Sequence, residues 1–221
     1  MATVRLDQKS RAIVRPISNS YTSALAKYFG NGPTNITLAK AQHSAYIAAL
    51  KANGVEVTII DVDHNHPDCV FVEDQAVVID GHVLLPLPGH ESRRGEQPPI
   101  ANFLSGVLQS HQISKMLPPA MMDGGDILRL GNLFFVGRST RTNDAGISEL
   151  KELLDYLGHE LRIIDIPTHT LHLTSISSSP SDKIILVAEG YLTPGAFGKL
   201  PEGCEIIMLP KDLTKDLKDR L

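Results

Sequence analysis

The feature that most constrains the fold is an order of elements that recurs four times along the 221 residues. Each repeat reads as an extended segment, a helix and a second extended segment, in a unit of about fifty residues. A repeat of this kind does not bury its apolar face alone, so neighbouring repeats pack on one another. The sequence therefore predicts an α/β fold of related modules around a centre, where the first strands of the modules meet.

The boundaries of the repeats follow from apolar runs and from glycine and proline. The predicted helices are 37–53, 100–111 (preceded by Pro98 and Pro99) and 144–157, with a Gly- and Pro-interrupted stretch, 191–201, at the helix position of the fourth repeat. The predicted strands are 11–15, 55–61, 69–79, 82–87, 126–130, 133–137, 162–166, 171–176, 183–188 and 204–209. Hairpins are predicted at Asp80-Gly81 and Gly131-Asn132. The tail, 211–221, has leucines at a spacing of four and favours a short amphipathic helix.

Composition narrows the class of partner. The formal net charge is -4 and the pI is near 6.1, which argues against broad electrostatic binding of nucleic acid or of an anionic membrane. No apolar run approaches the roughly 20 residues of a membrane span, and the first residues lack a secretory signal. Two cysteines make no disulfide framework. We expect one cytoplasmic domain over residues 1–221, with reduced thiols and a small-molecule partner.

Charged residues gather where the repeats begin, which is where a central site would lie. They are Asp68, Glu73, Asp74 and the pair Arg93-Arg94 in the second repeat, Asp123, Asp126, Arg138 and Arg141 in the third, and His172 in the fourth. Adjacent carboxylates suit a planar guanidinium, and arginines suit a carboxylate by the same geometry. Together they describe an amino acid with a guanidinium tail. A histidine oriented by Asp123 would carry protons.

Each of these interpretations has a structural alternative. The acids of PDCVFVED could pair with Arg93 or Arg141 in salt bridges that only stabilise the fold. His172 could be a satisfied core histidine, and the glycines of MDGGD could form no more than a tight turn. The stretch HNHPDC offers His64, His66, Asp68 and Cys69 as zinc ligands, although no second His/Cys cluster completes the set.

The motifs PDCVFVEDQAVV, SRR at 92–94, MDGGDILRLGNLFFVGRSTRTN and LHLTS resemble those of the dimethylargininases (dimethylarginine dimethylaminohydrolases). The likeness extends from about Arg11 to Leu209. It implies a pentein-type α/β propeller of ββαβ modules, of which four of five are recognisable here. It also implies hydrolysis of Nω-methylated L-arginine to L-citrulline and an alkylamine, with no cofactor and no metal.

The resemblance also implies roles for individual residues. Glu73 and Asp74 would bind the substrate guanidinium, with Asp68 beside them, and Arg93 and Arg141 would bind its α-carboxylate. His172 would be the general acid and base, and Asp123 would orient it. Tyr21 matches a lid position where dimethylargininases often carry leucine.

The resemblance ends before the segment that carries the family's cysteine nucleophile, near residue 212. Neither Cys69 nor Cys204 matches that position, so the sequence predicts a C-terminally truncated and catalytically impaired chain. The alternative is a non-catalytic module that binds arginine-like ligands or a macromolecule. An open ring would also expose strand edges, which favours a homo-oligomer.

Overall fold

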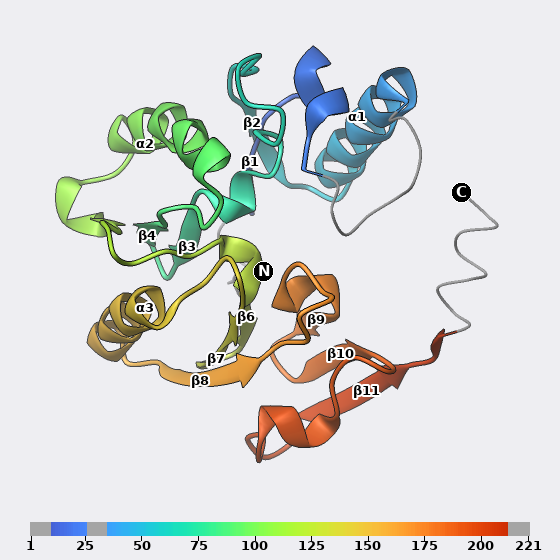
Figure 1. The fold of residues 1–221 in the computed structure, drawn as a ribbon, viewed down its shortest axis with the longest axis vertical. Helices are drawn as coiled ribbons and strands as arrows, with labels where there is room; N and C mark the ends of the chain where they lie inside the picture. The colour runs from blue at the N-terminus through green and yellow to red at the C-terminus, as the bar shows by residue number, and fades with distance from the viewer. Residues whose placement is uncertain (1–9, 26–34, 212–221) are drawn as a thin grey trace. The chain divides into compact units, whose positions relative to one another are not determined.

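The computed structural model describes residues 10–25 and 35–211, and the chain divides at Lys115-Met116 into two compact units. We call them the N-terminal unit and the C-terminal unit and describe each by itself. Figure 1 shows the order of the elements along the chain. The expectation of a single domain over residues 1–221 stays a prediction. The helix predicted at 211–221 lies outside the described residues, apart from Lys211.

The N-terminal unit contains two small sheets. Its elements are β1 Arg11–Val14, α1 Ile36–Ala52, β2 Glu56–Ile59, β3 Val77–Ile79, β4 His82–Leu85, α2 Gln97–Ser105 and β5 Ile113–Lys115. Strands β1 and β2 are parallel and are connected through α1. Strands β3 and β4 form an antiparallel hairpin, and β5 lies parallel to β4. The core of this unit lies between the second sheet and α2, where Val83, Leu85, Ile100 and Leu104 are buried.

The C-terminal unit repeats the hairpin-plus-parallel-strand order twice. Its elements are β6 Ile127–Leu130, β7 Leu133–Arg138, α3 Asp144–Leu157, β8 Glu160–Asp165, β9 Ser177–Ser181, β10 Ile184–Ala188 and β11 Glu205–Leu209. The pair β6 and β7 is antiparallel and β8 is parallel to β7; β9, β10 and β11 follow the same pattern. The ββαβ order that the resemblance implies is therefore complete in the β3–β5 and β6–β8 modules, and the α/β fold class is confirmed.

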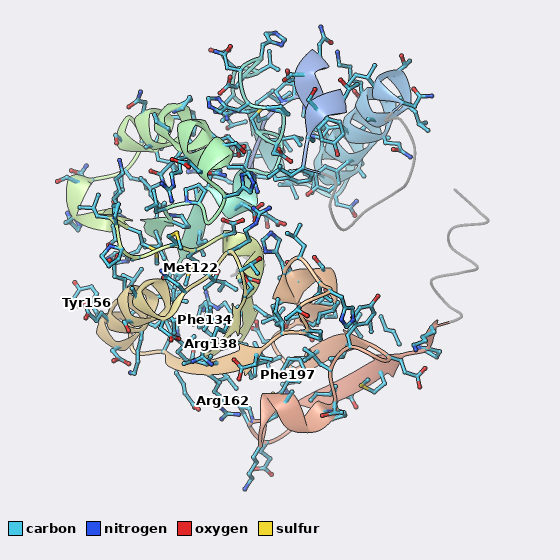
Figure 2. All side chains as sticks on the ribbon, in the orientation of Figure 1. Met122, Phe134, Arg138, Tyr156, Arg162 and Phe197 are labelled. Atoms are coloured by element: carbon cyan, nitrogen blue, oxygen red, sulfur yellow. The ribbon has the colours of Figure 1, made fainter. Side chains whose placement is uncertain are left out.

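Aromatic side chains fill the core of the C-terminal unit. The ring of Phe197 meets the ring of Phe135 edge-on, with 5.2 Å between centroids. Phe134 is also buried, and the guanidinium of Arg129 lies 5.0 Å from the centre of its ring. Figure 2 shows Phe134 and Phe197 inside this unit, whereas Tyr156 points outward and is 78% exposed. These contacts fix β6, β7 and the segment before β11 against one another.

Several segments differ from the sequence-based prediction: the short strands β5 and β9 were not predicted, and three further segments hold 3₁₀ turns. Residues 69–76 and 171–176 are not strands; each contains a 3₁₀ turn, η2 Val72–Asp74 and η6 Leu173–Ser175. The helix position of the fourth repeat holds a further 3₁₀ turn, η7 Pro194–Phe197. Apolar runs of this length predict strands, but the polar side chains inside the first two find partners that a regular ladder does not offer.

Helix α2 differs only at its ends. Pro98 and Pro99 lie in its first turn rather than before it, where the missing N–H groups cost nothing. The helix ends at Ser105, well before residue 111. None of the helices in the described residues combines the length and apolarity that crossing a membrane requires.

The start of α3 positions residues 121–123, at the edge of the candidate site. Asn143 caps the helix, because its side chain accepts hydrogen bonds from the N–H of Gly146 at 2.9 Å and of Met121 at 3.1 Å. The backbone N–H of Asn143 donates to the carbonyl of Met121 at 3.1 Å. A side chain at Gly146 would collide with that same carbonyl. Residues 121–123 are therefore placed by backbone contacts with α3.

We expect Gly146→Ala to lower the free energy of unfolding by about 1–3 kcal/mol, because the added methyl group pushes the backbone at Met121 away from α3. Urea denaturation measures the change. Ser148→Ala, at an exposed position of the same helix, is the control and should stay within about 0.5 kcal/mol of the parent chain. Equal stability of the two variants would contradict the close approach of α3 to Met121.

Candidate functional site

Three 3₁₀ turns of the same form place the residues singled out in the sequence. Turns η2, η5 (Gly124–Asp126) and η6 come just before β3, β6 and β9, the first strands of their modules. In each turn a backbone N–H donates to the carbonyl three residues earlier: Asp74 to Phe71 at 3.2 Å, Asp126 to Asp123 at 3.0 Å and Ser175 to His172 at 3.2 Å. The glycines of MDGGD thus do form a turn, and equivalent turns carry acids in two modules and a histidine in the third.

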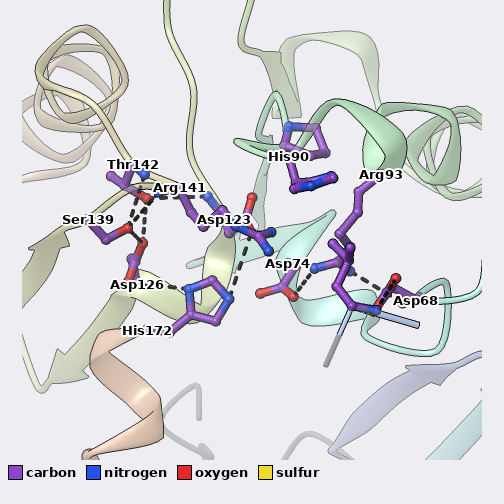
Figure 3. Close-up of polar contacts among 12 residues, drawn as sticks. Asp68, Asp74, His90, Arg93, Asp123, Asp126, Ser139, Arg141, Thr142 and His172 are labelled. Atoms are coloured by element: carbon purple, nitrogen blue, oxygen red, sulfur yellow. Dashed lines mark hydrogen bonds and ion pairs between the residues drawn. The ribbon is translucent and has the colours of Figure 1, made fainter. Parts of the chain in front are cut away.

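In the N-terminal unit, Arg93 contacts two buried acids, of which Figure 3 shows Asp74. Its Nη1 donates to Oδ2 of Asp74 at 2.7 Å, and its Nη2 donates to Oε2 of Glu96 at 2.9 Å. Burial by itself would lower the pKa of Arg93, but the two carboxylates outweigh burial and raise that pKa above its ordinary value. The salt bridge that the sequence left open as an alternative is therefore present for Asp74.

The other two predicted guanidinium ligands have different surroundings. Glu73 is exposed, one residue before the buried Asp74. Asp68 is buried, and its carboxylate accepts the backbone N–H of Leu25 at 3.1 Å. Asp68 therefore holds the end of the segment that contains Tyr21.

Tyr21, the predicted lid residue, lies in the 3₁₀ turn η1 (Asn19–Ser23). Its ring lies 6.3 Å from the ring of Phe71, measured between centroids. Burial, together with the negative charge of Asp68, raises the pKa of Tyr21, so its hydroxyl remains protonated near neutral pH.

In the C-terminal unit, two carboxylates flank the imidazole of His172, as Figure 3 shows. Oδ2 of Asp123 lies 3.7 Å from Nε2, and Oδ1 of Asp126 lies 3.4 Å from Nδ1. The same oxygen of Asp123 accepts a hydrogen bond from Nη1 of Arg141 at 3.0 Å. Two acids on opposite ring nitrogens stabilise the positive charge that His172 acquires when it takes up a proton.

Asp126 contacts the histidine without having been assigned a role from the sequence. It is fully buried. One oxygen accepts the hydroxyls of Ser139 at 2.6 Å and Thr142 at 2.7 Å, and the other accepts the N–H of Leu173 at 3.1 Å. That last bond connects η5, the turn before β6, to the residue after His172. The sequence offered Asp126 as the second acid of MDGGD. Its contact with His172 could not be predicted, because the two residues lie far apart along the chain.

Among the residues that the structure describes, the buried charged groups of each unit contain one carboxylate more than arginine. In the N-terminal unit the acids Asp68, Asp74 and Glu96 face Arg15 and Arg93, three against two. In the C-terminal unit Asp123 and Asp126 face Arg141, two against one, with His172 between the acids. Buried charge is costly unless it is compensated, so both clusters favour a positive group, either a bound cation or a protonated histidine.

Neither cysteine has the surroundings of a nucleophile. Cys69 is fully buried, and its thiol donates to the carbonyl of Asp63 at 3.3 Å. Burial raises the pKa of Cys69, which keeps it in the unreactive thiol form. Cys204 is half-buried, and its sulfur lies 3.8 Å from the carbonyl oxygen of Asp182.

The stretch HNHPDC is organised by hydrogen bonds within the protein. Nδ1 of His66 lies 2.7 Å from Oδ2 of Asp63, and Nδ1 of His64 lies 3.2 Å from Oγ of Ser18. Among the residues that the structure describes, no three donors of this stretch come together as metal ligands. The zinc interpretation of this stretch therefore gains no support from the described residues.

A family model for eukaryotic N,N dimethylarginine dimethylhydrolase matches residues 18–195, well over half of the chain. The chain belongs to the dimethylarginine dimethylaminohydrolase family. The dimethylarginine dimethylaminohydrolase of Streptomyces coelicolor is 33% identical over 177 residues, which cover 80% of this chain and 67% of that relative. The enzyme of the same name from Pseudomonas aeruginosa is 28% identical over 181 residues, which cover 82% of this chain and 69% of the relative.

Solved structures agree with this family. A cysteine-to-serine variant of the Pseudomonas aeruginosa dimethylarginine dimethylaminohydrolase, complexed with citrulline, superposes with a TM-score of 0.82 at 28% identity, covering 93% of this chain and 78% of that one. The N-terminal domain of the arginine dihydrolase ArgZ superposes with a TM-score of 0.77 at 17% identity, covering 91% and 76%. The second likeness shows the fold alone, and that fold is the pentein type that the sequence predicts.

We expect Asp126→Asn to lower the free energy of unfolding by about 1–3 kcal/mol, because the new amide group sets a donor against the hydroxyls and the N–H that Asp126 now accepts. Urea denaturation provides the measurement. Asp144→Asn is the control: it removes an acid of the same unit that is 78% exposed and pairs with Arg138 at the surface, and it should leave the midpoint close to that of the parent chain. Equal effects of the two variants would contradict the buried network.

Proposed function

We propose that this chain recognises Nω-methylated L-arginine and supplies the proton-transfer residues for its hydrolysis to L-citrulline and an alkylamine. The excess of buried carboxylate over arginine in each unit supports a cationic ligand. Membership of the dimethylarginine dimethylaminohydrolase family supports the choice of a guanidinium as that cation. The α-carboxylate of the same ligand suits a protein that also carries buried arginines.

The proposed roles follow the chemistry of each side chain. Glu73 and Asp74 bind the guanidinium, with Asp68 nearby to hold the segment of Tyr21, the proposed lid. Arg93 and Arg141 bind the α-carboxylate in exchange for the protein carboxylates that they contact in this structure. His172 protonates the departing amine and then activates water, and Asp123 and Asp126 stabilise its charged form. Carboxylates that fix a guanidinium in one orientation prepare its central carbon for attack, because they hold both its charge and its geometry.

Attack on the guanidinium carbon requires a thiolate, and neither cysteine of this sequence fits that role. The raised pKa of Cys69 and its donation to Asp63 make it a structural residue. We therefore propose that these residues bind and orient the substrate and do not complete hydrolysis by themselves. The same observation favours a second candidate, a binding module for arginine-like ligands that performs no catalysis.

We expect Nω,Nω-dimethyl-L-arginine to bind the purified chain, with an affinity that falls at least about tenfold in Glu73→Ala, because an ion-paired hydrogen bond is lost. Titration calorimetry measures both. Glu91→Ala removes an equally exposed acid from the same unit and should bind like the parent chain. If the parent chain binds no guanidino compound, the proposed function is wrong.

We also expect no release of citrulline from dimethylarginine by the parent chain, and none by the double variant Cys69→Ser and Cys204→Ser. A colorimetric citrulline assay provides the measurement. Turnover by the parent chain that disappears in one of the single cysteine variants would show that this thiol is the nucleophile after all. Turnover by the double variant would exclude a thiol mechanism altogether.

A further inference from the structure

The carboxylate of Asp126 is held by neutral donors on both of its oxygens. Oδ2 accepts the hydroxyls of Ser139 at 2.6 Å and of Thr142 at 2.7 Å, as Figure 3 shows. Oδ1 accepts the backbone N–H of Leu173 at 3.1 Å. Asp126 is fully buried, so these groups provide the hydrogen bonds that water would otherwise supply. Donors on both oxygens fix the plane of the carboxylate and stabilise its negative charge.

The hydrogen atoms of the two hydroxyls have a defined direction. Oγ of Ser139 accepts the backbone N–H groups of Arg141 at 2.9 Å and of Thr142 at 3.2 Å. Oγ1 of Thr142 accepts the backbone N–H of Asp123 at 3.4 Å. A hydroxyl that accepts N–H groups has its own hydrogen left for a further acceptor, and for both hydroxyls that acceptor is Asp126. The backbone of this segment therefore orients both hydroxyls toward one carboxylate.

Strand β7 leaves room for the carboxylate at Gly137. A Cβ atom there would lie 3.2 Å from Oδ1 of Asp126 and 3.0 Å from Cβ of Leu173, both closer than an ordinary contact. The backbone of β7 thus lies directly against the carboxylate. Because β7, the hydroxyls and Leu173 all surround it, Asp126 has little freedom to turn.

Oδ1 of Asp126 faces one particular nitrogen of His172. It lies 3.4 Å from Nδ1, whereas Oδ2 of Asp123 lies 3.7 Å from Nε2. The Asp123 oxygen also accepts the cationic Nη1 of Arg141 at 3.0 Å, which compensates part of its charge. The donors that hold Asp126 are neutral and leave its charge in place. A proton on Nδ1 is therefore stabilised more strongly than a proton on Nε2.

We propose that Ser139 and Thr142 are positioning residues that act through Asp126: their hydroxyls hold its carboxylate against His172, so that the neutral ring carries its proton on Nδ1 and transfers protons at Nε2. The use of Nε2 rests on the proposed function, in which His172 protonates the departing amine. The Nε2 proton of the imidazolium passes to that amine, and the neutral Nε2 then takes a proton from the water that it activates. The proton on Nδ1 stays in place throughout.

NMR chemical shifts of the two ring nitrogens show which of them carries the proton. In the isotopically labelled, ligand-free parent chain, at a pH where the ring of His172 is neutral, we expect the form protonated on Nδ1 to exceed the other at least about tenfold. Thr142→Val keeps the shape and removes one hydroxyl, and it should lower that ratio at least about threefold. Thr142→Ser keeps the hydroxyl and should keep the ratio. The signals of His172 are assigned by their loss in His172→Gln.

Thr140→Val is the matched control, because Thr140 is an exposed threonine of the same segment, and it should leave the ratio unchanged. The inference is overturned if the neutral ring of the parent chain carries its proton on Nε2, if Thr142→Val keeps the ratio of the parent chain, or if Thr142→Ser loses it. The first of these results needs no variant, so it decides even where a substitution prevents folding.

The outcomes separate this inference from the proposed function. A parent chain that binds dimethylarginine but carries its neutral-ring proton on Nε2 overturns the inference and leaves the proposed function standing. A parent chain that carries the proton on Nδ1 but binds no guanidino compound supports the positioning of His172 by Asp126, whereas the use of Nε2 falls together with the proposed function.

Discussion

The interaction on which both units depend is the ion pair between a buried carboxylate at the start of a module and an arginine of the same unit. Asp74 with Arg93, and Asp123 with Arg141, are held at 2.7 Å and 3.0 Å. Each acid sits in or at the edge of a 3₁₀ turn, where a regular strand would have directed its side chain into an apolar layer. The arginine therefore permits the turn, and the turn places the acid where the first strand of the module begins.

The same pairing explains why the clusters suit a cation although arginines already occupy them. Each arginine lies within a group that has more acids than arginines, because Glu96 shares Arg93 and Asp126 accompanies Asp123. In one unit the surplus negative charge suits a guanidinium, and in the other it suits a histidine that carries a proton. Membership of the dimethylarginine dimethylaminohydrolase family supports the proposal that both clusters serve the recognition of a methylated guanidinium.

Much of the fold could be predicted because its signals are local. Asn143 and Gly158 mark the ends of α3, and Asp80-Gly81 marks the β3–β4 hairpin. The turns at η2 and η6 could not be predicted, since Val- and Leu-rich residues indicate a strand until the partners of the neighbouring acids or histidine are known. The site was predictable as a set of residue types, but the pairing was not. Which acid meets which arginine depends on contacts between residues far apart in sequence, and Glu96, beside a helix start, reads as an ordinary N-terminal charge.

The most direct test of the account is a double-mutant cycle on Asp74 and Arg93. The free energies of unfolding of Asp74→Ala, Arg93→Ala and the double variant are compared with that of the parent chain by urea denaturation. The account predicts that each single variant is destabilised because it leaves a buried charge uncompensated, and that the double variant recovers at least about 1 kcal/mol of the summed loss. Losses that add to within about 0.5 kcal/mol would show that the two side chains are not coupled, and would contradict the account.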